Sequence, residues 1–223
     1  MNDLIDVLKL EQQSETHFIG RSKDLGFPKV FGGQVIGQGL SAASQTVENR
    51  QPHSLHAYFL RPGDASHPID YEVEVIRDGG SFSMRRVVAS QFGKQILNMS
   101  ISFHQDEAGF EHQDVMPSVP GPEHFESELD LYRAHASEIP DKIRDLFIAD
   151  RPIECRVVEN QNPFRPRHGM AKRHMWIKSV APLPDNQLIH QSMLAYTSDY
   201  GFLETALMPH GVSIGNRYLN IAS

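Results

Sequence analysis

The stretch LIHQSMLAYTSDYGFLETALM, residues 188–208, is the one from which the fold can be worked out. Asp185 and Asn186 before it are types that cap helix starts, and Pro209 and Gly211 after it end helices. Large apolar side chains recur in it at helical spacing and form one stripe: Ile189, Met193, Tyr196, Tyr200, Leu203 and Leu207. The spacing predicts one long helix with a continuous apolar face.

One acid lies beside that stripe. The adjacent row is Leu188, Ser192, Ala195, Asp199, Phe202 and Ala206, and the polar side is marked by His190, Thr197 and Glu204. An ionised carboxylate next to an apolar face is costly unless it is paired, and partial desolvation raises the pKa of such a group toward that of a useful base. Asp199 is therefore a candidate general base. The alternative is that Asp199 lies at the edge of the face, capped by an arginine or by water.

Composition bounds the fold and the partners. The chain has 223 residues, of which 39% are hydrophobic and 22% charged, enough for one large domain or two ordinary units. Its formal net charge of -7 gives no general attraction to nucleic acid or to an anionic membrane. We expect neither as a partner.

The single cysteine, Cys155, excludes an intrachain disulfide and suits a reducing compartment. No Cys/His motif surrounds it, so a small buried hydrophobic role is favoured over a nucleophile. No window approaches the roughly 18 apolar residues of a membrane helix, and the first residues show no basic region before an apolar core. We expect a soluble cytoplasmic protein without a secretory signal.

The first half of the chain predicts a sheet around one helix. Residues 34–47 predict a helix with an apolar stripe of Ile36, Leu40, Ala43 and Val47. Two glycines inside that helix, Gly37 and Gly39, each cost about 1 kcal/mol relative to alanine. Close approach of a wrapping sheet would offset that cost. Residues 55–103 then alternate with period two in four runs, and the breaks at 78–80 and 92–94 are typical of hairpins.

The second half repeats this order. Residues 106–122 are a proline- and glycine-containing linker, followed by amphipathic helices at 123–135 and 141–148. Strands are predicted at 153–159 and 175–180, before the long helix. We therefore divide the chain into a first unit (1–105), a linker with helices (106–150) and a second unit (151–223).

Several motifs occur together in one order: Phe31-Gly-Gly-Gln34, HAYFLRPG at 56–63, RDGGSF at 77–82 with Arg85-Arg-Val87, Asn162-Pro-Phe164, Tyr196-Thr-Ser-Asp199 and Pro209-His-Gly211. From about Leu8 to the last residue the chain resembles the acyl-CoA thioesterase II family. The resemblance implies an α+β double hot-dog fold, in which an antiparallel sheet wraps a central helix. It also implies hydrolysis of acyl-CoA to a free fatty acid and coenzyme A by activated water, without a covalent intermediate.

In that family, an aspartate at the position of Asp199 works with a threonine and a glutamine, and both lie beyond the point where this sequence stops at Ser223. The resemblance thus implies an incomplete second hot-dog unit and a truncated chain, whose apolar stripe would be covered by another copy or by the missing segment. Because hot-dog proteins associate through their sheets, a homo-oligomer is expected. The alternative function is a catalytically inactive acyl-CoA-binding or oligomerisation scaffold.

Other constellations give weaker signals. One basic cluster could dock the phosphates of coenzyme A or be a solvated loop: Arg165, Arg167, His168, Lys172, Arg173 and His174. The motif arginines are expected to pair with carboxylates such as Asp64 or Asp78. The twelve histidines show no metal-ligand spacing, so neither a metal nor a cofactor is expected. No G-x-S-x-G occurs, which disfavours a serine hydrolase. A hydratase would need a histidine paired with an acid, and His190 lies on the polar side.

Overall fold

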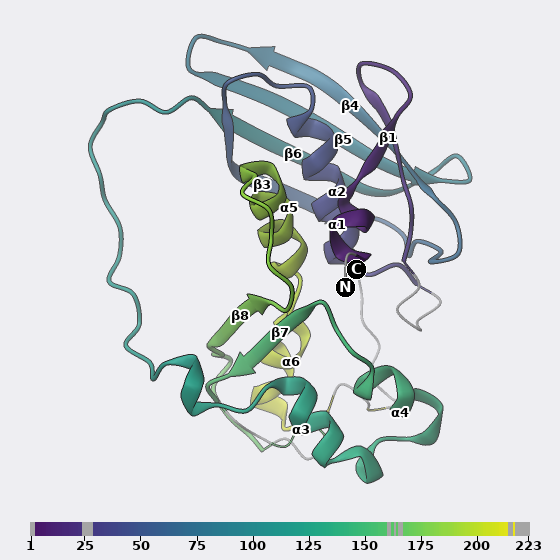
Figure 1. The fold of residues 1–223 in the computed structure, drawn as a ribbon, viewed down its shortest axis with the longest axis vertical. Helices are drawn as coiled ribbons and strands as arrows, with labels where there is room; N and C mark the ends of the chain where they lie inside the picture. Colours follow the sequence, from purple (N-terminus) through teal and green to yellow (C-terminus); the bar gives the residue numbers. More distant parts are fainter. Residues whose placement is uncertain are drawn as a thin grey trace. The chain divides into compact units, whose positions relative to one another are not determined.

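The computed structural model describes residues 3–23, 29–159, 162, 164, 167–213 and 216 (Figure 1). They form two compact units. The first consists of the residues up to Glu111 together with Leu183–Asp199, and the second of His112–Pro182 together with the described residues from Tyr200 onwards. The three-part division made from the sequence stays a prediction.

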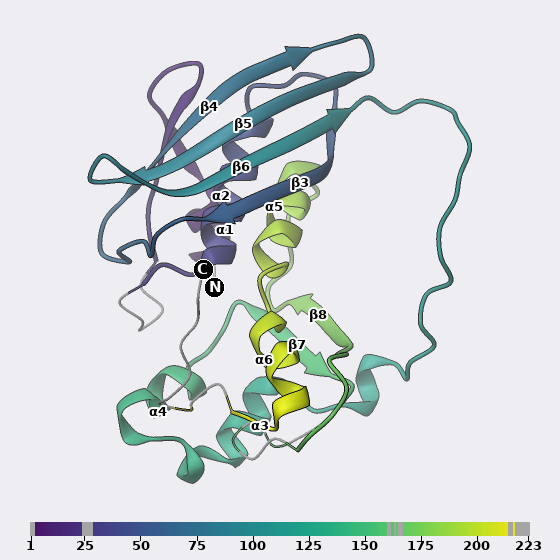
Figure 2. The same ribbon diagram turned by 180° about the vertical axis from the view of Figure 1, so that it is seen from behind.

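The first unit contains one six-stranded antiparallel sheet in the order β1-β2-β4-β5-β6-β3. Figure 2 shows β4, β5, β6 and β3 side by side across it. The strands are β1 (Leu10–Gln12), β2 (His17–Gly20), β3 (Gln51–Phe59), β4 (Ile69–Asp78), β5 (Phe82–Gln91) and β6 (Lys94–His104). The helices are α1 (Asp3–Leu8), α2 (Gly32–Ser44) and α5 (Gln187–Thr197). Strands β1 and β2 pair antiparallel and form a hairpin.

The sheet wraps around α2, as the alternating pattern predicts. From Leu97 to Phe103, every second residue of β6 is buried, and these side chains share one core cluster with Leu40 of α2. The turn between β5 and β6 has positive φ at Phe92 and Gly93, which matches the twist of a tight hairpin. Both predicted hairpins are therefore confirmed.

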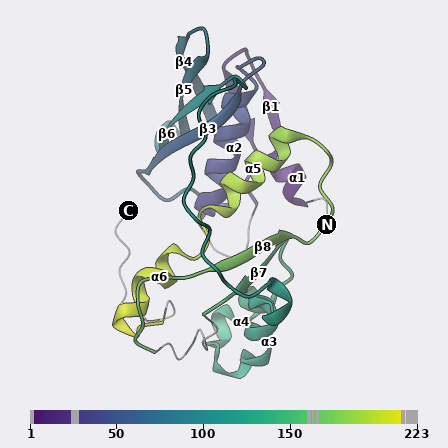
Figure 3. The same ribbon diagram turned by 90° about the vertical axis from the view of Figure 1, so that its left-hand side faces the viewer.

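Two glycines of α2 face different partners. A Cβ at Gly39 would lie 2.6 Å from Cε of Met99 on β6, so here the sheet makes the predicted close approach. A Cβ at Gly37 would lie 3.0 Å from the carbonyl oxygen of Ser192 on α5. Helix α2 consequently lies between the sheet and α5 (Figure 3).

The prediction of one long helix over residues 188–208 is wrong. The structure has α5 and a separate short helix, α6 (Phe202–Leu207), with Gly201 between them at φ 79°. This left-handed conformation cannot continue a right-handed helix, and glycine adopts it without steric cost. The hydroxyls of Thr197 and Ser198 also donate to carbonyl oxygens in the last turn of α5, at 3.0 and 2.7 Å.

The expectation that the apolar stripe needs another copy or a missing segment to cover it is wrong for α5. Met193 and Tyr196 are buried within the first unit, where α5 packs against α2. Thr197, assigned to the polar side from the helical pattern, is buried as well.

The second unit starts, at His112, within a mostly exposed stretch without regular structure that spans residues 105–121. Its elements are η1 (Pro122–His124), α3 (Glu128–Ala134), η2 (Ala136–Glu138), α4 (Asp141–Ile148), β7 (Ile153–Val157), β8 (Met175–Ser179), α6 and η3 (Met208–His210). β7 and β8 form a two-stranded antiparallel sheet. An aromatic cluster of Tyr132, Phe147 and Phe164 has ring centroids 5.1–5.9 Å apart.

Candidate active site

Asp199 lies just beyond the end of α5 and is half-buried. Its Oδ2 accepts a hydrogen bond of 2.9 Å from the backbone N–H of Gly33, in the first turn of α2. The N-cap residue of α2, Phe31, makes no side-chain capping bond. A carboxylate from a distant segment therefore binds at this helix start, where the unpaired N–H groups and the helix dipole favour negative charge. The sequence did not indicate this backbone partner.

Two glycines allow this approach. A Cβ at Gly32 would lie 2.7 Å from Oδ2 of Asp199 and 2.7 Å from Cζ of Phe59. A Cβ at Gly33 would lie 2.1 Å from the carbonyl oxygen of Tyr196. Real side chains do not sit at such distances, so the Gly32-Gly33 pair is a requirement of the contact between α2 and the end of α5.

Aromatic rings lie around the glycine pair that the carboxylate approaches. The rings of Phe31 and Tyr196 meet edge to face with centroids 5.0 Å apart, and the ring of Phe59 closes on the other side of Gly32. Apolar walls lower the local dielectric, which strengthens the hydrogen bond between the Gly33 amide and the carboxylate. The site thus combines an acid, a helix start and apolar surface, which suits an apolar substrate with a polar reacting group.

The glutamine of the Phe31-Gly-Gly-Gln34 motif is fully buried. Its Oε1 accepts from the N–H of Lys23 at 3.1 Å, and its Nε2 donates to the carbonyl oxygen of Arg21 at 3.2 Å. The Gln34 side chain therefore anchors residues 21–23 to α2. The sequence signalled the motif but not this anchoring role.

Two members of the basic cluster, Arg173 and His174, are held in ion pairs. Arg173 pairs with Glu128 at 2.9 Å and lies 3.9 Å from Glu204, and His174 pairs with Glu159 at 2.5 Å. These carboxylates offset the charges of Arg173 and His174. Arg165 lies outside the described residues. The two interpretations of the cluster, a dock for phosphate or a solvated loop, both stay predictions.

Two of the four motif arginines, Arg85 and Arg86, pair with carboxylates as predicted. Arg85 is buried and bonds to Asp78 at 2.9 Å, to the hydroxyl of Thr46 at 2.8 Å and to the carbonyl oxygen of Thr46 at 2.9 Å. Arg86 pairs with Glu74. Arg85 thus ties the β4–β5 hairpin to the segment that follows α2.

Cys155 is buried on β7, and burial raises the pKa of its thiol to about 12. The thiolate is consequently scarce near neutral pH, which argues against a nucleophilic role. Within the part of the chain that the structure describes, no group of three or more metal-binding side chains could hold an ion. In the same residues, no helix has the length and apolar character needed to cross a membrane.

Comparison with known proteins decides the family. The family model described as "Acyl-CoA thioesterase N-terminal domain" matches residues 21–104, and the one described as "Acyl-CoA thioesterase" matches residues 142–223. Acyl-CoA thioesterase 2 of Haemophilus influenzae is 42% identical over 224 residues, covering 100% of this chain and 78% of that protein. The chain belongs to the acyl-CoA thioesterase family.

Other family members agree. Human acyl-coenzyme A thioesterase 8 is 38% identical over 214 residues, covering 92% of this chain and 67% of that protein. The crystal structure of an acyl-CoA thioesterase II from Mycobacterium marinum matches with a TM-score of 0.70 and 34% identity, covering 93% of this chain and 71% of that one. The hot-dog fold is confirmed, and the two-stranded sheet β7–β8 fits an incomplete second hot-dog unit. These family members give no support to the inactive scaffold.

Proposed function

We propose that this chain hydrolyses acyl-CoA thioesters to a free fatty acid and coenzyme A, with Asp199 as the general base. The family membership supports the thioester substrate. The observation that carries the role of Asp199 is its half-buried carboxylate at the start of α2, beside a glycine pair that aromatic rings flank. A carboxylate has about four acceptor positions, so it can hold the Gly33 amide and a water molecule together.

The chemistry requires two contributions. Asp199 takes a proton from water as the water oxygen attacks the carbonyl carbon of the thioester, and negative charge develops on the carbonyl oxygen. Collapse of this intermediate breaks the carbon–sulfur bond, and coenzyme A leaves as a thiolate that is then protonated. The positive end of the α2 dipole suits the developing oxyanion, because a charge fixed in a low-dielectric site stabilises it without reorganising.

Replacement of the base tests this role. Asp199→Asn keeps an acceptor for the Gly33 amide but cannot take a proton, so kcat for thiol release from acyl-CoA should fall about 10²–10⁴-fold. Asp185→Asn, the same substitution at an exposed position before α5, is the matched control and should retain the activity of the unmodified chain. Activity of Asp199→Asn within threefold of the unmodified chain would contradict the proposal.

We also propose that the protein is a cytoplasmic homo-oligomer that acts in fatty acid metabolism. Tyr58 on β3 and Phe82 on β5 expose 65% and 50% of their surface, which favours a further contact on the sheet. Cys155 is a free thiol, in keeping with a reducing compartment. Light scattering on the purified chain should give a mass at least twice the 25.2 kDa of one chain. A monomer mass would refute the oligomer.

A further inference from the structure

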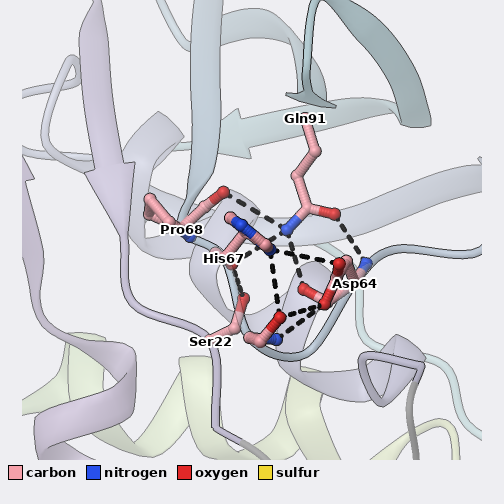
Figure 4. A network of polar contacts seen from close by, with 6 residues as sticks. Ser22, Asp64, His67, Pro68 and Gln91 are labelled. Atoms are coloured by element: carbon pink, nitrogen blue, oxygen red, sulfur yellow. Dashed lines mark hydrogen bonds and ion pairs between the residues drawn. The ribbon is translucent and has the colours of Figure 1, made fainter.

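Gln91, the last residue of β5, is buried, and both the oxygen and the nitrogen of its side-chain amide form hydrogen bonds with the backbone of one loop (Figure 4). Its Oε1 accepts from the N–H of Asp64 at 2.7 Å. Its Nε2 donates to the carbonyl oxygens of Asp64 and His67, both at 2.9 Å, and of Pro68 at 3.2 Å. The amide therefore replaces the backbone partners that the loop between β3 and β4 would otherwise lack.

The same loop is closed by its own side chains. Oδ1 of Asp64 accepts from the N–H and the hydroxyl of Ser66, at 2.9 and 2.6 Å, and Oδ2 lies 3.1 Å from Nδ1 of His67. The hydroxyl of Ser22 donates to the carbonyl oxygen of His67 at 2.6 Å. Residues 63–68 are thus held together by their own hydrogen bonds, and Gln91 fixes their position.

The loop at residues 63–68 in turn contacts residues 29–31, which lead into α2. The N–H of Val30 donates to the carbonyl oxygen of Gly63 at 2.9 Å, and Lys29 forms a β-bridge with Asp64. The fit is tight, because a Cβ at Gly63 would lie 3.2 Å from Oε1 of Gln91 and 3.4 Å from Cβ of Val30. Val30 lies only three positions before Gly33, whose amide binds Asp199.

We propose that Gln91 is a positioning residue for the active site: through the loop at residues 63–68 and the segment at 29–31, it sets the start of α2 against the carboxylate of Asp199. The proposal rests on the proposed function, since it assumes that Asp199 is the base. Gln91 lies at the end of β5 and does not itself contact the start of α2, so its role in the reaction is indirect.

Only glutamine fits the required pattern of one acceptor and two donors at this length. An ionised glutamate would set its oxygens against three carbonyl oxygens, and methionine, of similar size, offers no donor to them. With Gln91→Met the loop loses its hydrogen bonds, and Val30 and the start of α2 shift with it. Because a displacement of about 1 Å in a reacting site can cost up to 10²-fold, we expect kcat to fall about 10- to 100-fold while KM stays within threefold.

Steady-state thiol release on the full chain tests this proposal, with Gln95→Met as matched control. Gln95 is exposed on β6, four residues further along, so the control should leave both constants unchanged. Gly63→Ala perturbs the same connection more mildly and should lower kcat about 2- to 10-fold. All rates are normalised to the folded fraction measured by circular dichroism.

A double-mutant cycle separates positioning from simple stabilisation. If Gln91 acts through the contact with Asp199, Gln91→Met has no further effect on kcat in the Asp199→Asn background. Equal effects in both backgrounds would overturn the proposal. The amide resonance of Gly33 is a readout that does not depend on turnover, and it should shift with Gln91→Met and not with Gln95→Met; an unmoved resonance would overturn the proposal too.

The two proposals fail in different ways. If Asp199→Asn retains activity, the role of Asp199 as base is wrong. If Asp199→Asn is inactive while Gln91→Met behaves like Gln95→Met in both kcat and the Gly33 resonance, the base stands and the positioning role is wrong.

Discussion

Replacing Gly33 with alanine should destabilise the first unit by about 3–5 kcal/mol. The added Cβ would lie 2.1 Å from the carbonyl oxygen of Tyr196 and 2.4 Å from Cε1 of Phe31, so α5 must move away from α2 by about 1 Å. Backbone atoms cannot rotate aside as a flexible side chain can.

Three losses make up this magnitude. Overpacking of this kind costs about 1–3 kcal/mol, a hydrogen bond to a charged group about 1.5–3 kcal/mol, and an edge-to-face aromatic pair about 0.5–1.5 kcal/mol. The half-exposed carboxylate of Asp199 places its bond at the lower end of its range. The better helix propensity of alanine offsets about 0.5–1 kcal/mol of this destabilisation.

Urea unfolding followed by circular dichroism measures the loss as a lower midpoint at unchanged slope. Gly80→Ala is the control, because a Cβ there meets no atom within 4 Å, and it should change stability by less than about 0.5 kcal/mol. A Gly33→Ala variant within 1 kcal/mol of the unmodified chain would refute the close contact between α2 and α5.

Three further outcomes are expected. Arg85→Met should cost about 2–4 kcal/mol in urea unfolding, since it removes buried hydrogen bonds, whereas Arg86→Met, on the exposed face, should cost less than about 1 kcal/mol; equal losses would contradict the assignment. Hydrogen bonds from Ser83 and Arg85 hold the pKa of Asp78 below its ordinary value. The ionised carboxylate therefore stabilises the fold above about pH 4, and this contribution is lost as the pH falls further. Asp78→Asn should narrow the difference in the free energy of unfolding between pH 6 and pH 3. Iodoacetamide at pH 8 should label Cys155 at least about 100-fold more slowly in the native protein than in urea, because burial raises its pKa to about 12, and equal rates would show an open site.

The sheet and its central helix could be predicted because burial on one face leaves a period that is visible in the residues themselves. Asp199 could be found in the same way, as an acid beside an apolar stripe. The long helix was mispredicted because the apolar spacing continues through Gly201, although the chain turns there. The glycine and the hydroxyls of Thr197 and Ser198 were the local evidence against it.

Partners distant in the sequence could not be predicted. Gly33 and Asp199 are 166 positions apart, and only the missing capping side chain at Phe31 indicated that an acceptor comes from elsewhere. The basic cluster was ambiguous for the same reason, because Glu128 and Glu204, which neutralise Arg173, lie far along the chain on either side of it. Periodicity reports which face is buried but not what covers it.

The contact between α2 and α5 also sets an order of events during synthesis. The sheet and α2 come from the first 104 residues, whereas α5 begins at Gln187. At about 5–20 residues per second, a ribosome takes on the order of 10 s to bridge that gap. Through this interval the nascent chain displays the glycine-lined flank of α2 bare, as a surface open to chaperones and to neighbouring nascent chains until its own helix emerges.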